Sequence, residues 1–136
     1  LVAITPAAGF VAPDGAIYIG LAAGVVCYIG STWLKRILGY DDSLDAFGIH
    51  GIGGALGAIL TGVFALSSIN SLGRGLIDGN PDQVTTQAIG LAYATVYCGF
   101  VTTIILMVVK FTIGLRVSEE EEMEGLDITQ HGERVH

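Results

Sequence analysis

One histidine lies inside an uncharged run that is long enough to cross a lipid bilayer. His50 falls within residues 46–66, a stretch of apolar and small residues without a charged side chain. An ionisable side chain in hydrocarbon is costly, so it usually faces a polar path or a polar partner. A neutral imidazole both donates and accepts hydrogen bonds, and it titrates near physiological pH. The run therefore favours the passage of a small polar species beside His50.

A purely structural role for His50 is also open, in which the ring forms a hydrogen bond between two helices. A metal or redox site needs further ligands, and glycines occupy the positions three and four residues after His50. We therefore expect no metal and no cofactor. A regular helix would place His50 on one narrow face of small residues, which are Ala46, Gly53, Gly54, Gly57 and Thr61.

Acidic residues come directly before this run. Asp42 and Asp45 lie within the sequence Asp-Asp-Ser-Leu-Asp at residues 41–45. Asp is a favoured N-cap residue, and its carboxylate complements the positive end of the helix dipole. We expect these carboxylates, chiefly that of Asp45, to cap the helix that carries His50. A relay of protons or cations is the alternative role.

The composition places the whole chain in a membrane. Charged residues make up 14% of the 136, against about 25% in a soluble domain, and the mean hydropathy is +0.65. Three apolar runs cover about residues 16–34, 46–66 and 84–109, and about 20 apolar residues suffice to span the hydrocarbon as a helix. Only helices satisfy their backbone groups in such runs. The sequence predicts an all-α integral membrane protein with three transmembrane helices and a tail.

Basic residues give the expected orientation. Lys35 and Arg36 follow the first run, Lys110 and Arg116 follow the third, and Arg74 lies in the loop between the second and third. Under the positive-inside rule, the C-terminus is cytoplasmic. We expect an extracytoplasmic loop at 1–15, a transmembrane region at 16–116 and a cytoplasmic tail at 117–136 of a multi-pass protein in the plasma or inner membrane. Because the chain starts at Leu1 without a signal peptide, we expect a piece of a longer protein.

The tail is strongly acidic. Ser118 precedes four glutamates, which is typical of a helix start. Two glycine-containing clusters follow, Gly125-Leu126-Asp127 and His131-Gly132-Glu133. The negative charge argues against a nucleic-acid partner.

Three stretches resemble the ammonium transporter family, the Amt/Mep/Rh superfamily. They are residues 41–54 around His50, residues 114–133 of the tail, which is similar to that of the bacterial Amt branch, and residues 4–10. The resemblance implies that the three spans are the last of eleven helices, and that the protein is a homotrimer with one pore per subunit. It implies a transporter and not an enzyme.

The resemblance also implies roles for named residues. Ammonium would lose a proton, and ammonia would pass along a hydrophobic pore lined by a histidine pair. His50 would be one member of that pair, and Ala46 would border the pore one turn toward the cytoplasm. The tail residues Gly125, Leu126, Asp127, His131, Gly132 and Glu133 would be regulatory, with a PII-type nitrogen-signalling protein as a possible cytoplasmic partner. An ammonium sensor of the same fold and an Rh-type ammonia channel are the alternatives.

Overall fold

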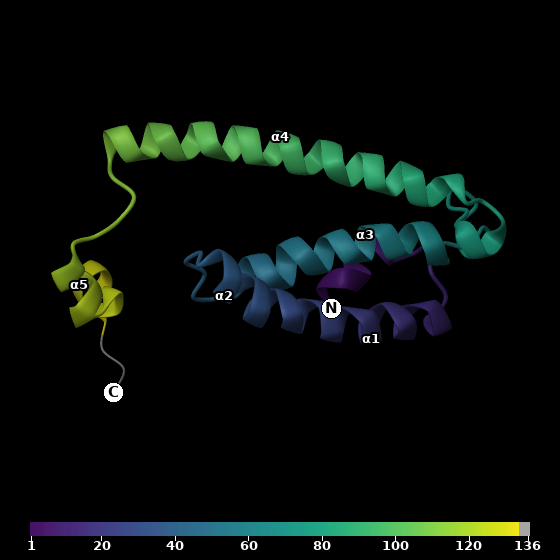
Figure 1. The fold of residues 1–136 in the computed structure, drawn as a ribbon, viewed down its shortest axis with the longest axis horizontal. Helices are drawn as coiled ribbons and strands as arrows, with labels where there is room; N and C mark the ends of the chain where they lie inside the picture. Colours follow the sequence, from purple (N-terminus) through teal and green to yellow (C-terminus); the bar gives the residue numbers. More distant parts are fainter. Residues whose placement is uncertain (134–136) are drawn as a thin grey trace. The chain divides into compact units, whose positions relative to one another are not determined.

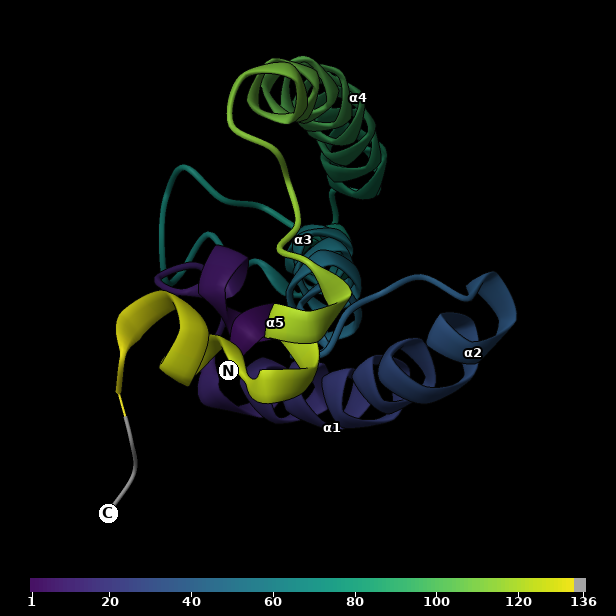
Figure 2. The same cartoon turned by 90° about the vertical axis from the view of Figure 1, so that its left-hand side faces the viewer.

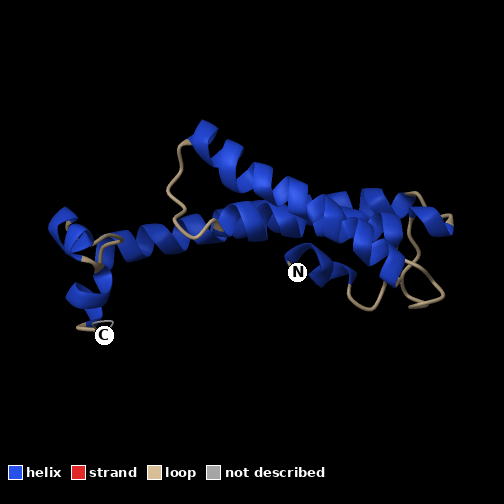
Figure 3. Cartoon of the chain, turned by 90° about the horizontal axis from the view of Figure 1, so that it is seen from below, coloured by secondary structure: helices blue, strands red, loops and turns tan. Residues whose placement is uncertain are grey.

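The described part of the chain, residues 1–133 of a computed structural model, consists of helices joined by loops (Figure 3). Within these residues, β-type backbone pairing is limited to one isolated bridge between Val11 and Ala65. The expectation of an all-α protein is confirmed. The elements in chain order are η1 (Val2–Ala7), α1 (Pro13–Ile29), η2 (Gly30–Leu34), α2 (Lys35–Leu38), η3 (Phe47–Gly51), α3 (Ile52–Phe64), η4 (Leu76–Asp78), α4 (Asp82–Thr112), α5 (Glu119–Glu124) and η5 (Asp127–His131).

Three helical stretches are long and apolar enough to cross a membrane. The first joins α1, η2 and α2 into 26 residues, Pro13–Leu38, the second joins η3 and α3 into Phe47–Phe64, and the third is α4. The first begins with Pro13 in its first turn, where a missing N–H is harmless. It ends at Gly39, whose φ of 62° is left-handed. The first and third helices extend beyond the predicted spans 16–34 and 84–109, whereas the second stops two residues before the predicted Leu66.

The described residues divide into two compact units, each of which is considered by itself. The first unit is Leu1–Ala94, and the second begins at Thr95 within α4. The core of the first unit is small: Ala3, Ala7 and Ile19 are buried, and five partly buried side chains pack against them. That core lies where η1 is seated beside α1 and α3 (Figures 1 and 2).

The segment Val2–Ala7 is helical, within residues 1–15 that we expected to be an extracytoplasmic loop. It forms a 3₁₀ helix, and Ala3 and Ala7 are buried. The glycines of α3 make this possible, because a Cβ added to Gly57 would overlap the backbone carbonyl of Ala3. Small residues permit close approach of backbones in membrane proteins. The opening segment is therefore part of the packed unit, against the middle of α3.

The loop between α3 and α4 is held by its own polar groups. The Asp78 carboxylate accepts the N–H of Ser67 at 3.0 Å, and Arg74 Nε donates to the Asp78 carbonyl at 2.8 Å. Hydrogen bonds from the hydroxyl and then the N–H of Ser67, with a smaller effect of Arg74, lower the pKa of Asp78 below its ordinary value of 3.8. Ionised Asp78 therefore stabilises the fold of this loop.

This pKa difference predicts how the loop responds to acid. A carboxyl group with a lowered folded pKa contributes stability above its unfolded pKa, and the contribution is lost as pH falls through the folded value. We expect amide protection in residues 66–80 to be constant near neutral pH and to decrease as the pH falls below 3.8. Hydrogen exchange read by mass spectrometry and corrected for intrinsic rates measures it. The Asp78→Asn variant should show weaker protection near neutral pH and no such decrease; equal protection in both proteins would contradict the assignment.

Candidate functional site

The His50 ring is carried by a wide helical turn. In η3 the Ile52 N–H donates to the carbonyl of Phe47, five residues earlier, so the turn holds one residue more than a regular α-helical turn. His50 is exposed, and within residues 1–133 its ring makes no hydrogen bond and no ion pair. An imidazole with no partner is thus presented at the surface of the first unit.

The wide turn changes which residues share a face. Gly48, Gly53, Gly57 and Thr61 are buried, whereas Ala46 and His50 are exposed. A regular helix would have aligned His50 with Gly53 and Gly57, as we expected from the spacing. A turn closed by a hydrogen bond over five residues aligns positions i and i+5. Gly48, and not His50, therefore lies on the same face as Gly53 and Gly57. The expected single face is therefore wrong: Gly53 and Gly57 pack inward, whereas the His50 side chain is exposed.

The turn exists where two helices cross in close contact. The first helix also has a wide turn, η2, in which Lys35 N–H donates to the Gly30 carbonyl. A Cβ added to Gly30 would lie 3.2 Å from the Gly48 carbonyl, and one added to Gly48 would lie 2.8 Å from Ser31 Cα. The two wide turns therefore touch through glycine backbones. A larger residue at either position would separate them.

The start of the His50 helix is capped by Asp42. Its carboxylate oxygens accept the N–H groups of Ala46 and Phe47, each at 2.8 Å. These N–H groups belong to the first helical turn and have no partner within the helix. The expectation that Asp45 is the chief capping side chain is wrong, because its carboxylate bonds elsewhere.

Asp45 forms an ion pair with Lys35. The distance from Lys35 Nζ to Asp45 Oδ1 is 2.8 Å, with both side chains partly exposed. Asp45 also has a φ of 53°, the one positive φ at a non-glycine residue in the described chain. Asp and Asn adopt this conformation more readily than other non-glycine residues. The backbone shape and the ion pair together turn this carboxylate away from the helix that it precedes.

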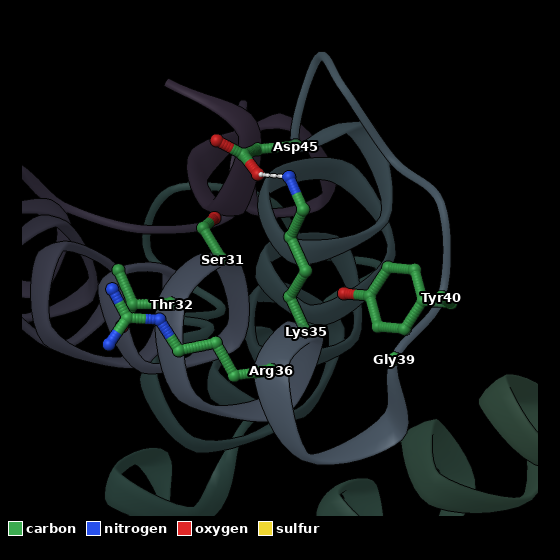
Figure 4. A pocket seen from close by; sticks show the side chains of 7 residues that line it. All are labelled: Ser31, Thr32, Lys35, Arg36, Gly39, Tyr40 and Asp45. Atoms are coloured by element: carbon green, nitrogen blue, oxygen red, sulfur yellow. Dashed lines mark hydrogen bonds and ion pairs between the residues drawn. The ribbon is translucent and has the colours of Figure 1, made fainter.

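A pocket of about 470 Å³ opens beside this ion pair (Figure 4). Its lining combines charged and hydroxyl side chains, which are Ser31, Thr32, Lys35, Arg36, Tyr40 and Asp45, together with Gly39. The Tyr40 ring lies edge-on to the ring of Phe47, with centroids 5.6 Å apart. His50 is not part of this lining. The polar pocket and the imidazole are therefore distinct features of the same helix pair.

The tail clusters lie in the second unit. Ser118 and Glu121 form a capping box at the start of α5, with the Ser118 N–H and hydroxyl donating to the Glu121 carboxylate at 3.0 and 2.9 Å. These two bonds, the backbone one first, lower the pKa of Glu121. Gly125 and Gly132 have φ values of 104° and 67°, so each permits a reversal that other residues rarely make.

The structure places both predicted tail clusters around η5. Leu126 and Asp127 lead into this short helix, and His131 ends it. The Glu133 N–H donates to the Asp127 carbonyl at 2.8 Å, which links the two clusters directly. Within residues 1–133, no group of three His, Cys, Asp or Glu side chains is arranged to hold a metal ion. The tail therefore presents a small folded motif of acidic and polar groups.

Sequence reasoning missed one residue of the site. From the sequence, Lys35 only indicates membrane orientation; in the structure it bonds to the Asp42 carbonyl and to the Asp45 carboxylate. A lysine at the end of one apolar run, followed ten residues later by an aspartate at the start of the next, was the available signal. Helices joined by so short a connection pack as neighbours, so their facing ends can pair.

These features define a multi-pass α-helical membrane protein in which one membrane helix carries an imidazole that has no partner within residues 1–133. Comparison with known proteins gives the family. The family model described as Ammonium Transporter Family matches residues 1–136. The chain is 50% identical over 137 aligned residues to the "Ammonium transporter" of Bacillus subtilis (strain 168), covering all of this chain and 34% of that protein. It is 48% identical to "Ammonium transporter Amt1" of Archaeoglobus fulgidus, covering 98% of this chain and 34% of that protein.

Solved structures agree with the sequence comparisons. The fold matches the crystal structure of Saccharomyces cerevisiae Mep2 with a TM-score of 0.77 and 36% identity, covering 87% of this chain and 28% of that chain. Candida albicans Mep2 matches with the same TM-score and 27% identity, covering 96% of this chain and 30% of that chain. The chain belongs to the Ammonium Transporter Family. It spans about a third of the length of the curated relatives that it matches.

Proposed function

We propose that this chain is part of a transporter that moves ammonium across the cell membrane, and that it acts as a transport protein and not as an enzyme. The observation that carries the proposal is the exposed His50 ring, which lies on an apolar membrane helix and bonds to nothing within residues 1–133. Curated relatives that match over almost the whole chain are named ammonium transporters, which supports the choice of substrate.

The transported species must lose its charge before it can cross the membrane along an apolar path. A full charge in hydrocarbon costs at least about 3 kcal/mol, whereas ammonia is neutral and accepts a hydrogen bond from an imidazole N–H. In this proposal ammonium first gives up its proton, which crosses along the pore imidazoles, while ammonia passes along the hydrophobic pore, so that net transport carries charge. Two adjacent imidazoles can exchange donor and acceptor roles. His50 is one member of such a pair, and the second histidine comes from another part of the same subunit.

Ala46 borders the pore on the cytoplasmic side of His50. It precedes the wide turn, it is exposed as His50 is, and its methyl side chain leaves space beside the path. Asp42 acts as the cap of this helix in the proposal, since its carboxylate is already engaged by two backbone N–H groups. The ion pair of Asp45 with Lys35 likewise favours a structural role over a proton relay.

The proposal includes the assembly and its regulation. We place the C-terminus in the cytoplasm, the subunits in a homotrimer with one pore each, and a PII-type nitrogen-signalling protein at the cytoplasmic face. The folded motif formed by Gly125–Asp127 and His131–Glu133 supports a regulatory contact, because its two clusters are already linked by a backbone hydrogen bond.

The test is replacement of His50 by alanine in the full-length transporter. Methylammonium-dependent current at equal membrane abundance is the measurement. We expect a changed current, because the variant loses the imidazole that exchanges protons and hydrogen bonds along the path. An unchanged current would assign His50 to a structural hydrogen bond between helices and would overturn the proposed role.

A further inference from the structure

The helix that carries His50 starts from a turn that a lysine of the preceding helix holds in place. Lys35 is the first residue of α2. Its Nζ donates to the Asp45 carboxylate at 2.8 Å and to the backbone carbonyl of Asp42. One ammonium group thus binds both ends of the turn 42–45. Figure 4 shows the Lys35 side chain directed at Asp45 across the pocket.

The same two aspartates set the first turn of the His50 helix. The Asp42 carboxylate accepts the N–H groups of Ala46 and Phe47, and the Asp45 carbonyl accepts the N–H of Ile49 at 2.9 Å. Since Ile49 directly precedes His50, a shift of this turn is transmitted to the ring through backbone hydrogen bonds. The Lys35 ammonium therefore holds the turn from which the His50 helix starts, and it makes no contact with His50 itself.

We propose that Lys35 is a positioning residue for His50, acting through its paired bonds to Asp42 and Asp45. The inference rests on the proposed function of His50. The φ of 53° at Asp45 supports it, because this conformation is uncommon at non-glycine residues, although Asp adopts it more readily than most, and contacts to the residue help to hold it. Here these contacts are the Lys35 ion pair on the side chain and the helix start on the backbone.

Arg36 provides a matched control for charge alone. It is the next residue of α2, it is exposed, and it also lines the pocket. Within residues 1–133 it forms no hydrogen bond or ion pair. If Lys35 served only to mark the cytoplasmic end of a span by its charge, the loss of either cation would have the same effect.

The experiment compares Lys35→Met, Lys35→Arg and Arg36→Met in the full-length protein. The first readout is the ¹⁵N chemical shift of the His50 ring, assigned by its disappearance in His50→Ala. The second is methylammonium-dependent current as a function of pH at equal membrane abundance. We expect Lys35→Met to move the His50 signal, to reduce the current several-fold and to shift its pH profile. Lys35→Arg should restore most of both, and Arg36→Met should match the parent.

A second variant covers the case in which Lys35→Met does not accumulate. Asp45→Asn keeps Lys35 and a residue type suited to a positive φ, but it removes the ion pair. It should change the ring signal and the current in the same direction as Lys35→Met. A His50 signal in both variants that equals that of Arg36→Met would overturn the positioning role. The ring signal does not depend on transport. If His50 has no role in conduction, that failure of the proposed function would show separately, as an unchanged current in His50→Ala.

Discussion

The Gly57→Ala variant is expected to unfold at a lower temperature than the parent protein. The added Cβ would overlap the Ala3 carbonyl oxygen and would lie 2.8 Å from the Ala3 carbonyl carbon and Cα. These are backbone atoms, which cannot rotate away as a side chain can. Overpacking of this kind costs about 1–3 kcal/mol. We expect the loss to be at the upper end, because η1 must move away from α3.

Thermal unfolding of the purified full-length protein in detergent measures this effect. Gly54→Ala is the control, since Gly54 lies three residues earlier in the same helix, and within residues 1–133 its added Cβ would meet no atom within 4 Å beyond its own helix backbone and chain neighbours. The control variant should melt as the parent does or slightly higher, because alanine favours helix by up to about 1 kcal/mol over glycine. Equal melting temperatures for the two variants would contradict the contact between Ala3 and Gly57.

Gly48→Ala is expected to separate the two wide turns. Its Cβ would lie 2.6 Å from Ser31 Oγ and 2.8 Å from both Ser31 N and Ser31 Cα. We expect a destabilisation of about 1–3 kcal/mol from overpacking. Under the proposed function it should also change the methylammonium current, because Gly48 lies in the turn that carries His50.

A second substitution tests whether this clash is with backbone or with side chain. Removal of the Ser31 hydroxyl in Ser31→Ala eliminates the contact with Oγ but leaves the contacts with N and Cα. We therefore expect the double variant Gly48→Ala/Ser31→Ala to remain nearly as unstable as Gly48→Ala in the same melting assay. A full recovery would show that the helices approach less closely than the structure has them.

Some of this structure could be predicted from sequence because it depends on local composition. An apolar run without charge must form a helix in a membrane, so the three helices around Ile19, His50 and Phe100 follow from hydropathy. The capping function of the acidic stretch also follows from residue type. The start of α5 directly after Ser118 follows from the serine that precedes four glutamates, and the capping box confirms it.

The remaining features depend on contacts between segments that are distant in the sequence. The wide turn at Phe47–Gly51 forms against Gly30 and Ser31 of the other helix, and a periodicity argument assumes a regular helix. Asp42 caps in place of Asp45 because Lys35 engages the Asp45 carboxylate. The sequence of Val2–Ala7, with Pro6 inside it, is typical of a loop. Its burial depends on the absence of a side chain at Gly57.

The contact between Ala3 and Gly57 has a consequence for biosynthesis. Ala3 is synthesised before α1, whereas Gly57 belongs to the helix that follows α1, so the contact cannot form until the ribosome has completed both helices. Until α3 has been synthesised, the opening segment lacks this packing partner. The order of translation thus makes the synthesis of α3 the event that allows this contact to form.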